Sequence, residues 1–326
     1  MPRSRATAAA AIAATVAAAV WTNAKWAFAA YCGRTPEEQA LEPFEAPVVV
    51  NGVRLNRLLK LHPARPDGVC FVLVHGFGGQ IPQWAPLIPQ LSAAGSVFAL
   101  DMVGHGRSQA TTNPADYDND AVLDSVVAAF TAECPRTRRI VLVGHSLGTS
   151  RCAQLLARFR AKHIEVAALV LLAPLSEPHA IDRPKSSLAA ASVTAINIFR
   201  FVDTFNGPYS ASVARMYHTA DLDTRLRQLR WNQATPTHVV RLAMLGAKVA
   251  SQSEFEAVNV PTLVIFGEFD VVTNPVPNAT NLQEWIRKAP LQFVCVSAGH
   301  ALMWEARDEV LRHLDSFLAT HKIIAA

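Results

Sequence analysis

A short stretch around Ser146 carries the residues best suited to nucleophilic chemistry. Ser146 lies in the middle of Gly144–Gly148, whose sequence is GHSLG. An apolar run over residues 140–143 precedes it and a helical pattern follows, which is the context of a nucleophilic serine on a sharp strand-to-helix turn. Gly144 and Gly148 leave room for the chain to pass closely while the serine adopts a strained backbone. The alternative is a serine that only caps a helix.

A nucleophilic serine needs a base, and the base needs an acid that orients it. Of the histidines after Ser146, His300 alone directly follows a strand-like run and opens a helical pattern. Asp270 follows another such run, 30 residues before His300. We therefore predict Ser146 as nucleophile, His300 as base and Asp270 as orienting acid. Glu268 is the rival acid, and an interface histidine or a turn aspartate are the structural alternatives.

A glycine-rich loop is predicted to stabilise the negative charge of an acyl-transfer intermediate. His75, Gly76, Phe77 and Gly78 follow the apolar run that ends at residue 74. Small residues there allow backbone N–H groups to face the site, so we assign the N–H groups of Phe77 and Leu147 to an oxyanion hole. His75 is expected to support this loop by hydrogen bonding.

The elements that must position these residues are alternating strands and helices. Residues 48–61 read as an antiparallel hairpin that turns at Asn51-Gly52. Further along, uninterrupted apolar runs predict strands that are buried on both faces. These runs are residues 70–74, 97–100, 140–143, 167–172, 263–266 and 293–296. Helical patterns lie between them, at residues 121–132, 147–160 and 282–288. This alternation indicates an α/β, doubly wound, mostly parallel sheet.

Between the runs that end at residue 172 and begin near residue 262, residues 175–250 are helical in pattern throughout. We interpret this stretch as a cap, or lid, over the site. Its aromatic and methionine residues are expected to line an apolar pocket, or else to form a small core of the cap itself. They are Phe199, Phe201, Phe205, Tyr209, Met216, Tyr217, Trp231 and Met244.

The N-terminus differs from the rest of the chain. Residues 1–36 contain no acid, and Arg3 and Arg5 precede an uncharged stretch, residues 6–24. Nineteen residues match a hydrocarbon core of ~30 Å as a helix. Possible membrane association through residues 6–24 competes with a cleaved secretory or organellar targeting peptide, and with an alanine-rich extension. Localisation stays open among these alternatives.

Composition excludes several classes of protein. With 51% hydrophobic and 17% charged residues the chain is globular, and its net charge of +4 includes no basic run typical of nucleic-acid binding. Cys70, Cys152 and Cys295 are expected to be buried free thiols. We find no spacing that predicts a metal site or a cofactor, and oligomeric state is not predicted.

Together, these motifs resemble the motif set of serine hydrolases of the α/β-hydrolase fold superfamily. The matching segments are 75–78, 101–108, 144–148, 267–270 and 299–300, and the resemblance runs from about residue 48 to 318. It implies an eight-stranded sheet with a helical cap inserted after the sixth strand, and it carries Ser146, Asp270 and His300 as the triad. Segment 101–108 resembles a structural turn of the family. Some acyltransferase-like relatives have Asp five residues after the histidine, where this chain has Glu305.

We expect the chain to have four parts: an anchor or targeting segment (1–38), a first core part (39–174), the cap (175–252) and a second core part (253–326). We expect a serine esterase of the lipase-like kind that acts on an apolar or lipid-like small-molecule ester. Thioester, amide or C–C bond hydrolysis, or acyl transfer, on the same residues is the alternative. A non-catalytic ligand-binding protein of the same fold is the third possibility.

Overall fold

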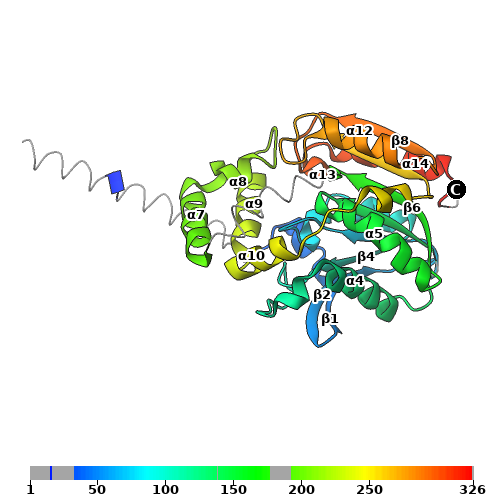
Figure 1. Cartoon of the computed structure of the whole chain (residues 1–326), viewed down its shortest axis with the longest axis horizontal. Coiled ribbons are helices and arrows are strands. Elements are labelled where there is room, and N and C mark those ends of the chain that lie inside the picture. The colour runs from blue at the N-terminus through cyan, green and yellow to red at the C-terminus, as the bar shows by residue number, and fades with distance from the viewer. Residues whose placement is uncertain (1–14, 17–32, 138, 177–191, 325–326) are drawn as a thin grey trace, which may run out of the picture.

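The computed structural model describes residues 15–16, 33–137, 139–176 and 192–324. Within them, eight strands form one sheet in the order β1-β2-β4-β3-β5-β6-β7-β8 (Figure 1). β1 and β2 are antiparallel, as are β2 and β4, and every other neighbouring pair is parallel. The predicted α/β fold with an eight-stranded, mostly parallel sheet is confirmed. The strands are β1 (Glu45–Val50), β2 (Val53–Lys60), β3 (Cys70–Val74), β4 (Ser96–Asp101), β5 (Arg139–His145), β6 (Glu165–Leu172), β7 (Thr262–Gly267) and β8 (Leu291–Val296).

Helices cover both faces of the sheet, which explains why its central strands are apolar without interruption. In β3, Val72 and Val74 pack with the helices of one face, and Phe71 and Leu73 with those of the other. The first face holds α4 (Asn119–Glu133), α5 (Leu147–Ala161), α11 (Gln252–Glu256) and α12 (Pro275–Trp285). The second holds α3 (Ile88–Ala94), α13 (Leu302–Glu305) and α14 (Arg307–Thr320).

Two local predictions differ from the structure. The helix expected at residues 282–288 is α12, which begins at Pro275, because proline is well accommodated in the first turn of a helix. Cys70 and Cys152 are buried as predicted, but Cys295 is exposed. The reason is that β8 is the edge strand of the sheet, so an apolar run there does not imply cover on both faces.

A helical insertion lies between β6 and β7, and we keep the name cap for it. It comprises α7 (Val193–Asn206), the 3-10 turn η4 (Gly207–Tyr209), α8 (Ala211–Ala214), α9 (Leu222–Ala234) and α10 (Thr237–Gly246). Helix α10 packs on the core through Val239 and Ala243, and a Cβ on Gly246 would lie only 1.9 Å from the backbone oxygen of Tyr117. Figure 1 shows α7 at the outer end of the cap, with α8, α9 and α10 on its inner side.

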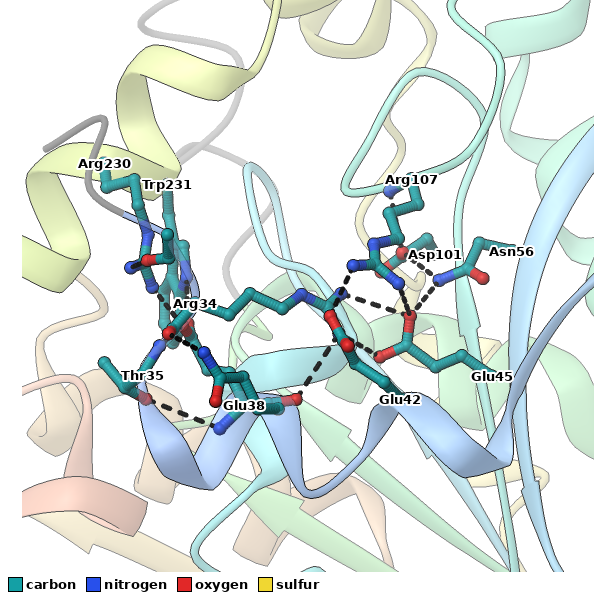
Figure 2. Close-up of polar contacts among 12 residues, drawn as sticks. Arg34, Thr35, Glu38, Glu42, Glu45, Asn56, Asp101, Arg107, Arg230 and Trp231 are labelled. Carbon is teal, nitrogen blue, oxygen red and sulfur yellow. Dashed lines mark hydrogen bonds and ion pairs between the residues drawn. The ribbon is translucent and has the colours of Figure 1, made fainter.

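An N-terminal strap, residues 33–45, connects the cap to the first strand (Figure 2). Its helix α2 (Pro36–Gln39) begins with a capping box in which the Thr35 N–H donates to Glu38 at 2.7 Å. The buried Glu38 also accepts from Trp231 Nε1 of α9 at 2.8 Å and pairs with Arg230. Arg34 binds both carboxylate oxygens of Glu45, at 2.6 and 3.1 Å. The strap therefore joins the cap to the core.

The segment after β4 has a structural role in the site, because its buried Asp101 holds two loops together. The Asp101 carboxylate accepts from the N–H groups of Ile81 and Arg107, at 2.6 and 2.9 Å, and from Asn56 Nδ2 at 2.8 Å. Burial raises the pKa of Asp101 to about 6, although these hydrogen bonds oppose the shift. Gly106 has φ +53°, and a Cβ there would lie 2.2 Å from the carboxylate.

The uncharged stretch at residues 6–24 lies outside the described residues, apart from residues 15 and 16. Among the helices that the structure does describe, none is both long enough and apolar enough to cross a membrane.

Candidate active site

The turn between β5 and α5 holds Ser146 in a strained conformation. Ser146 has φ +55° and ψ −125°, a region that non-glycine residues rarely occupy. A Cβ on Gly148 would lie 2.0 Å from the Val74 carbonyl oxygen, and a Cβ on Gly144 would lie 2.5 Å from that of Gly148. The two glycines are thus required by backbone contacts, and together they let the serine stand at the carboxyl edge of the sheet.

Asp270 and His300 meet at the same edge. His300 Nδ1 lies 2.9 Å from Asp270 Oδ2, and both side chains are buried. The carboxylate also accepts from Thr273 Oγ1 at 2.6 Å and from the N–H groups of Val272 and Thr273, at 2.8 and 3.1 Å. These contacts hold Asp270 in one orientation. The rival acid Glu268 is exposed and makes no hydrogen bond to the imidazole within the described residues.

Electrostatics keep the Asp270 carboxyl ionised. Burial alone would raise its pKa, but the charge and hydrogen bond of His300, together with the hydrogen bonds from Thr273, hold that pKa well below its usual range. A carboxylate in this state fixes the Nδ1–H tautomer of His300, which leaves Nε2 available to accept a proton.

His145 packs against His300 and hydrogen-bonds to its backbone. We predicted no role for His145 from the sequence. Its Nε2 donates to the backbone oxygen of His300 at 3.0 Å, and the two rings lie 4.7 Å apart between centroids. Burial lowers the pKa of His145 to about 3, assisted by repulsion from His300, so His145 remains neutral. The motif G-x-S-x-G leaves this position unspecified, so no sequence signal identified it.

The loop after β3 approaches the serine closely. A Cβ on Gly76 would lie 2.9 Å from the Ser146 Cβ and 3.4 Å from the backbone nitrogen of Leu147. Phe77 comes next, so the two N–H groups predicted to stabilise the oxyanion lie in adjacent backbone segments. Gly78 has φ +69°, where glycine is favoured.

His75 holds this loop in place. Met102 donates its N–H to His75 Nε2 at 3.0 Å, so the proton sits on Nδ1, which lies 2.7 Å from the Gly76 carbonyl oxygen. Burial, together with repulsion from His105, keeps the pKa of His75 well below its ordinary value. A neutral imidazole in this position acts as a structural hydrogen-bonding group.

A cavity of about 220 Å³ opens over these groups, and both Ser146 and His300 line it. Within the described residues the two side chains make no direct hydrogen bond, as is common in enzymes without substrate. Gln83 also lines the cavity; its side chain is buried, and its Nε2 has no partner among the described residues. Sequence reasoning did not identify Gln83, because an isolated glutamine in a loop carries no pattern.

The cap contributes a polar wall to this cavity. A chain of hydrogen bonds runs from Tyr217 through Gln228 (3.1 Å) to Asn232 (2.8 Å), from Asn232 to Ser212 (2.9 Å), and from Ser212 to the carboxylate of Asp203. All but Tyr217 line the cavity, as does Arg200. Because each donor is matched by an acceptor, the wall has a defined orientation.

The expectation that the aromatic residues of the cap line an apolar pocket is wrong for three of them. Phe201, Tyr209 and Phe205 are exposed, at 70%, 68% and 42%. Phe199, Met216 and Trp231 do line the cavity, whereas Tyr217 is buried within the small core of the cap. For Phe201 and Phe205 the physical reason is that α7 turns Arg200 and Asp203 toward the cavity, so these two side chains face away.

Glu305 connects the cap to the segment that carries His300. Its carboxylate accepts from the Gly299 N–H at 2.7 Å and from the Thr219 N–H at 2.5 Å. The Ala301 N–H donates to the Met216 carbonyl oxygen at 2.9 Å. Position 305, where some acyltransferase-like relatives carry Asp, therefore has a structural role in this chain: it joins the loop before His300 to the cap.

Comparison with known proteins places the chain in a family. A model of the alpha/beta hydrolase fold matches residues 69–307. The chain is 27% identical over 263 residues to an abhydrolase domain-containing protein of Schizosaccharomyces pombe (76% of this chain, 70% of that protein). It is 26% identical over 269 residues to a pimeloyl-[acyl-carrier protein] methyl ester esterase of Neisseria meningitidis (79% and 94%). A solved membrane phospholipase A, called a bacterial virulence factor, has the same fold with a TM-score of 0.65, 20% identity and 99% of each chain covered. This protein belongs to the α/β hydrolase fold family.

Proposed function

We propose that this protein is a serine hydrolase that cleaves a carboxylic ester through Ser146, His300 and Asp270. The observation that carries the proposal is the 2.9 Å contact between His300 and Asp270 beside a strained Ser146, with serine and histidine lining one cavity. A serine, a base and an orienting acid at one edge of the sheet form the constellation that supports acyl transfer.

In the proposed reaction, Ser146 Oγ attacks the acyl carbon while His300 Nε2 takes the hydroxyl proton. The N–H groups of Phe77 and Leu147 stabilise the oxyanion, and Asp270 stabilises the imidazolium. The intermediate then collapses to an acyl-serine, and Nε2 returns its proton to the leaving alcohol. A water that His300 deprotonates attacks the acyl carbon, which releases the acid and restores Ser146.

The cavity suggests which part of the ester enters the site. Its volume of about 220 Å³ is below the ~300–1,000 Å³ typical of pockets that enclose a whole drug-sized ligand. Met303, Trp304, Met216 and Val240 provide apolar walls, which favours an apolar or lipid-like ester whose remaining part extends outside. The Neisseria relative is named as a methyl ester esterase, which favours ester over amide or C–C bonds. Membrane association through residues 6–24 remains a prediction from sequence.

A fluorophosphonate probe tests the proposal, since it labels only an activated serine. We expect labelling of the full chain and none of Ser146→Ala, with unchanged circular dichroism. Ser150→Ala is the matched control, because Ser150 lies in α5 four residues after Ser146 but donates to the Leu175 carbonyl oxygen and does not line the cavity. Absence of labelling in folded protein would instead support a ligand-binding role. A series of esters of increasing acyl length then measures the preferred substrate.

A further inference from the structure

Helix α7 is amphipathic, but its apolar stripe faces outward. Ile198, Phe201, Val202 and Phe205 are spaced i, i+3, i+4 and i+7, which places them on one face. They are exposed by 61%, 70%, 52% and 42%. On the other side of the helix, Asp203 is buried and lines the cavity. We call these four residues the α7 stripe; a cluster of large apolar side chains left exposed in this way marks an interaction surface.

The stripe lies on the outermost helix of the cap, with the other cap helices on the opposite side (Figure 1). Arg200 anchors α7 from that inner side, where its Nη2 donates to the Asn232 carbonyl oxygen of α9 at 2.8 Å. Within the described residues, nothing covers the stripe enough to bury it. Its occupant must therefore come from outside this part of the chain.

The strap shows where the N-terminal chain arrives. Arg230 of α9 binds both the Gly33 carbonyl oxygen and Glu38, so residue 33 is held on the cap. The uncharged stretch ends at residue 24, nine residues earlier, and nine extended residues reach at most ~30 Å. A bilayer that contained residues 6–24 would therefore lie within that distance of α9.

An exposed tyrosine next to α7 fits a surface that meets lipid head groups. Tyr209, exposed by 68% just after α7, has the Arg225 guanidinium 5.8 Å from its ring. Tyrosine beside arginine is typical of the membrane–water boundary.

We propose that the α7 stripe lies in the head-group region of a lipid bilayer, with its apolar side chains toward the acyl chains. At 14 residues, α7 is about 21 Å long, too short to span, so it lies in the plane of the interface. Phe199 and Arg200 of the same helix line the cavity, so an ester that leaves the bilayer along α7 reaches Ser146. Docking goes beyond the proposed hydrolysis and does not depend on it.

Hydrogen exchange of the full chain tests the docking. Vesicles of phosphatidylcholine with phosphatidylglycerol should slow exchange of the α7 amides at least tenfold. Phe201→Ser with Phe205→Ser should abolish this slowing and lower hydrolysis of a vesicle-embedded ester about tenfold. Neither residue lines the cavity, so kcat/KM for a water-soluble short ester should stay within twofold. Val49→Ser is the matched control, because Val49 is 69% exposed in the β1–β2 hairpin and not on the cap.

Three results would overturn the proposal, and all are measured on the unsubstituted protein. Equal α7 exchange with and without vesicles excludes the bilayer. If the α7 amides exchange more slowly at higher protein concentration in the absence of lipid, the stripe contacts a second copy of the chain. Slow exchange that depends on neither lipid nor protein concentration assigns the stripe to a part of this chain outside the described residues. Fluorophosphonate labelling in the same samples keeps the two proposals separate, since protected α7 without labelling leaves docking intact and removes hydrolysis.

Discussion

Two regions border the same cavity but are built in opposite ways. One is the sharp turn at residues 144–148, which we call the elbow, and the other is the cap helix α7. At the elbow, apolar strands surround the turn and backbone contacts of Gly144 and Gly148 determine its shape. In α7, Asp203 and Arg200 face the cavity while the four apolar side chains of the α7 stripe face out. Contacts within the protein interior thus determine the conformation of the elbow. The cap helix α7 instead has one side toward the cavity and one side toward the surroundings of the protein.

The largest effect should come from the acid that serves the elbow. Asp270→Asn should lower kcat about 10⁴-fold, because His300 then loses the carboxylate that sets its tautomer and stabilises its charge. Steady-state kinetics on a soluble ester measure this. Glu268→Gln, which changes an exposed acid two residues away, is the control and should retain activity. The reverse pattern would assign the role to Glu268.

A side chain added at a glycine of the elbow should lower the stability of the protein. Gly148→Ala places a Cβ 2.0 Å from the Val74 carbonyl oxygen, so we expect a loss of unfolding free energy of about 4 kcal/mol or more in urea denaturation. Gly52→Ala is the control: its Cβ meets nothing within 4 Å, and only its positive φ should cost about 1 kcal/mol. Equal losses in the two variants would show that backbone contacts do not shape the elbow.

Buried histidines near the elbow should make the protein acid-sensitive. Burial lowers the pKa of His105 to about 4, below its unfolded value of about 6.5, so the unfolded state binds this proton more readily. The stabilising contribution is complete above pH 6.5 and is lost as pH falls to 4, about 3 kcal/mol in all. His105→Asn, whose amide can replace the hydrogen bond to Val103, should reduce the slope of unfolding free energy against pH. An equal slope in the unsubstituted protein and in His105→Asn would show that His105 does not contribute to the acid sensitivity.

The smallest effect should come from the strap that holds the cap. Glu38→Gln removes the charge that pairs with Arg230 and weakens the hydrogen bond to Trp231, at a cost of about 2 kcal/mol in unfolding free energy. Because Trp231 lines the cavity, KM for bulky esters should change about fivefold while kcat changes little. Glu37→Gln is the matched control, since the Glu37 side chain is 64% exposed. Identical kinetics in both variants would show that the strap does not influence the cavity.

The prediction of the strands and of the elbow rested on local signals. Strands that are buried on both faces must be apolar throughout, and a sharp turn requires small residues at fixed offsets from Ser146. Such rules act over a few residues, so they are visible in the sequence. They did not show that β8 lies at the edge of the sheet and exposes Cys295, because strand order depends on contacts between distant segments.

The sequence by itself determined the α/β fold, the family resemblance and the order serine, aspartate, histidine along the chain. The tertiary structure decided which acid contacts His300, how Glu305 joins the histidine loop to the cap, and that Glu38 holds Trp231. It also decided which way α7 faces. Helical periodicity shows that α7 has an apolar side, but the medium on each side depends on where the rest of the molecule places the helix.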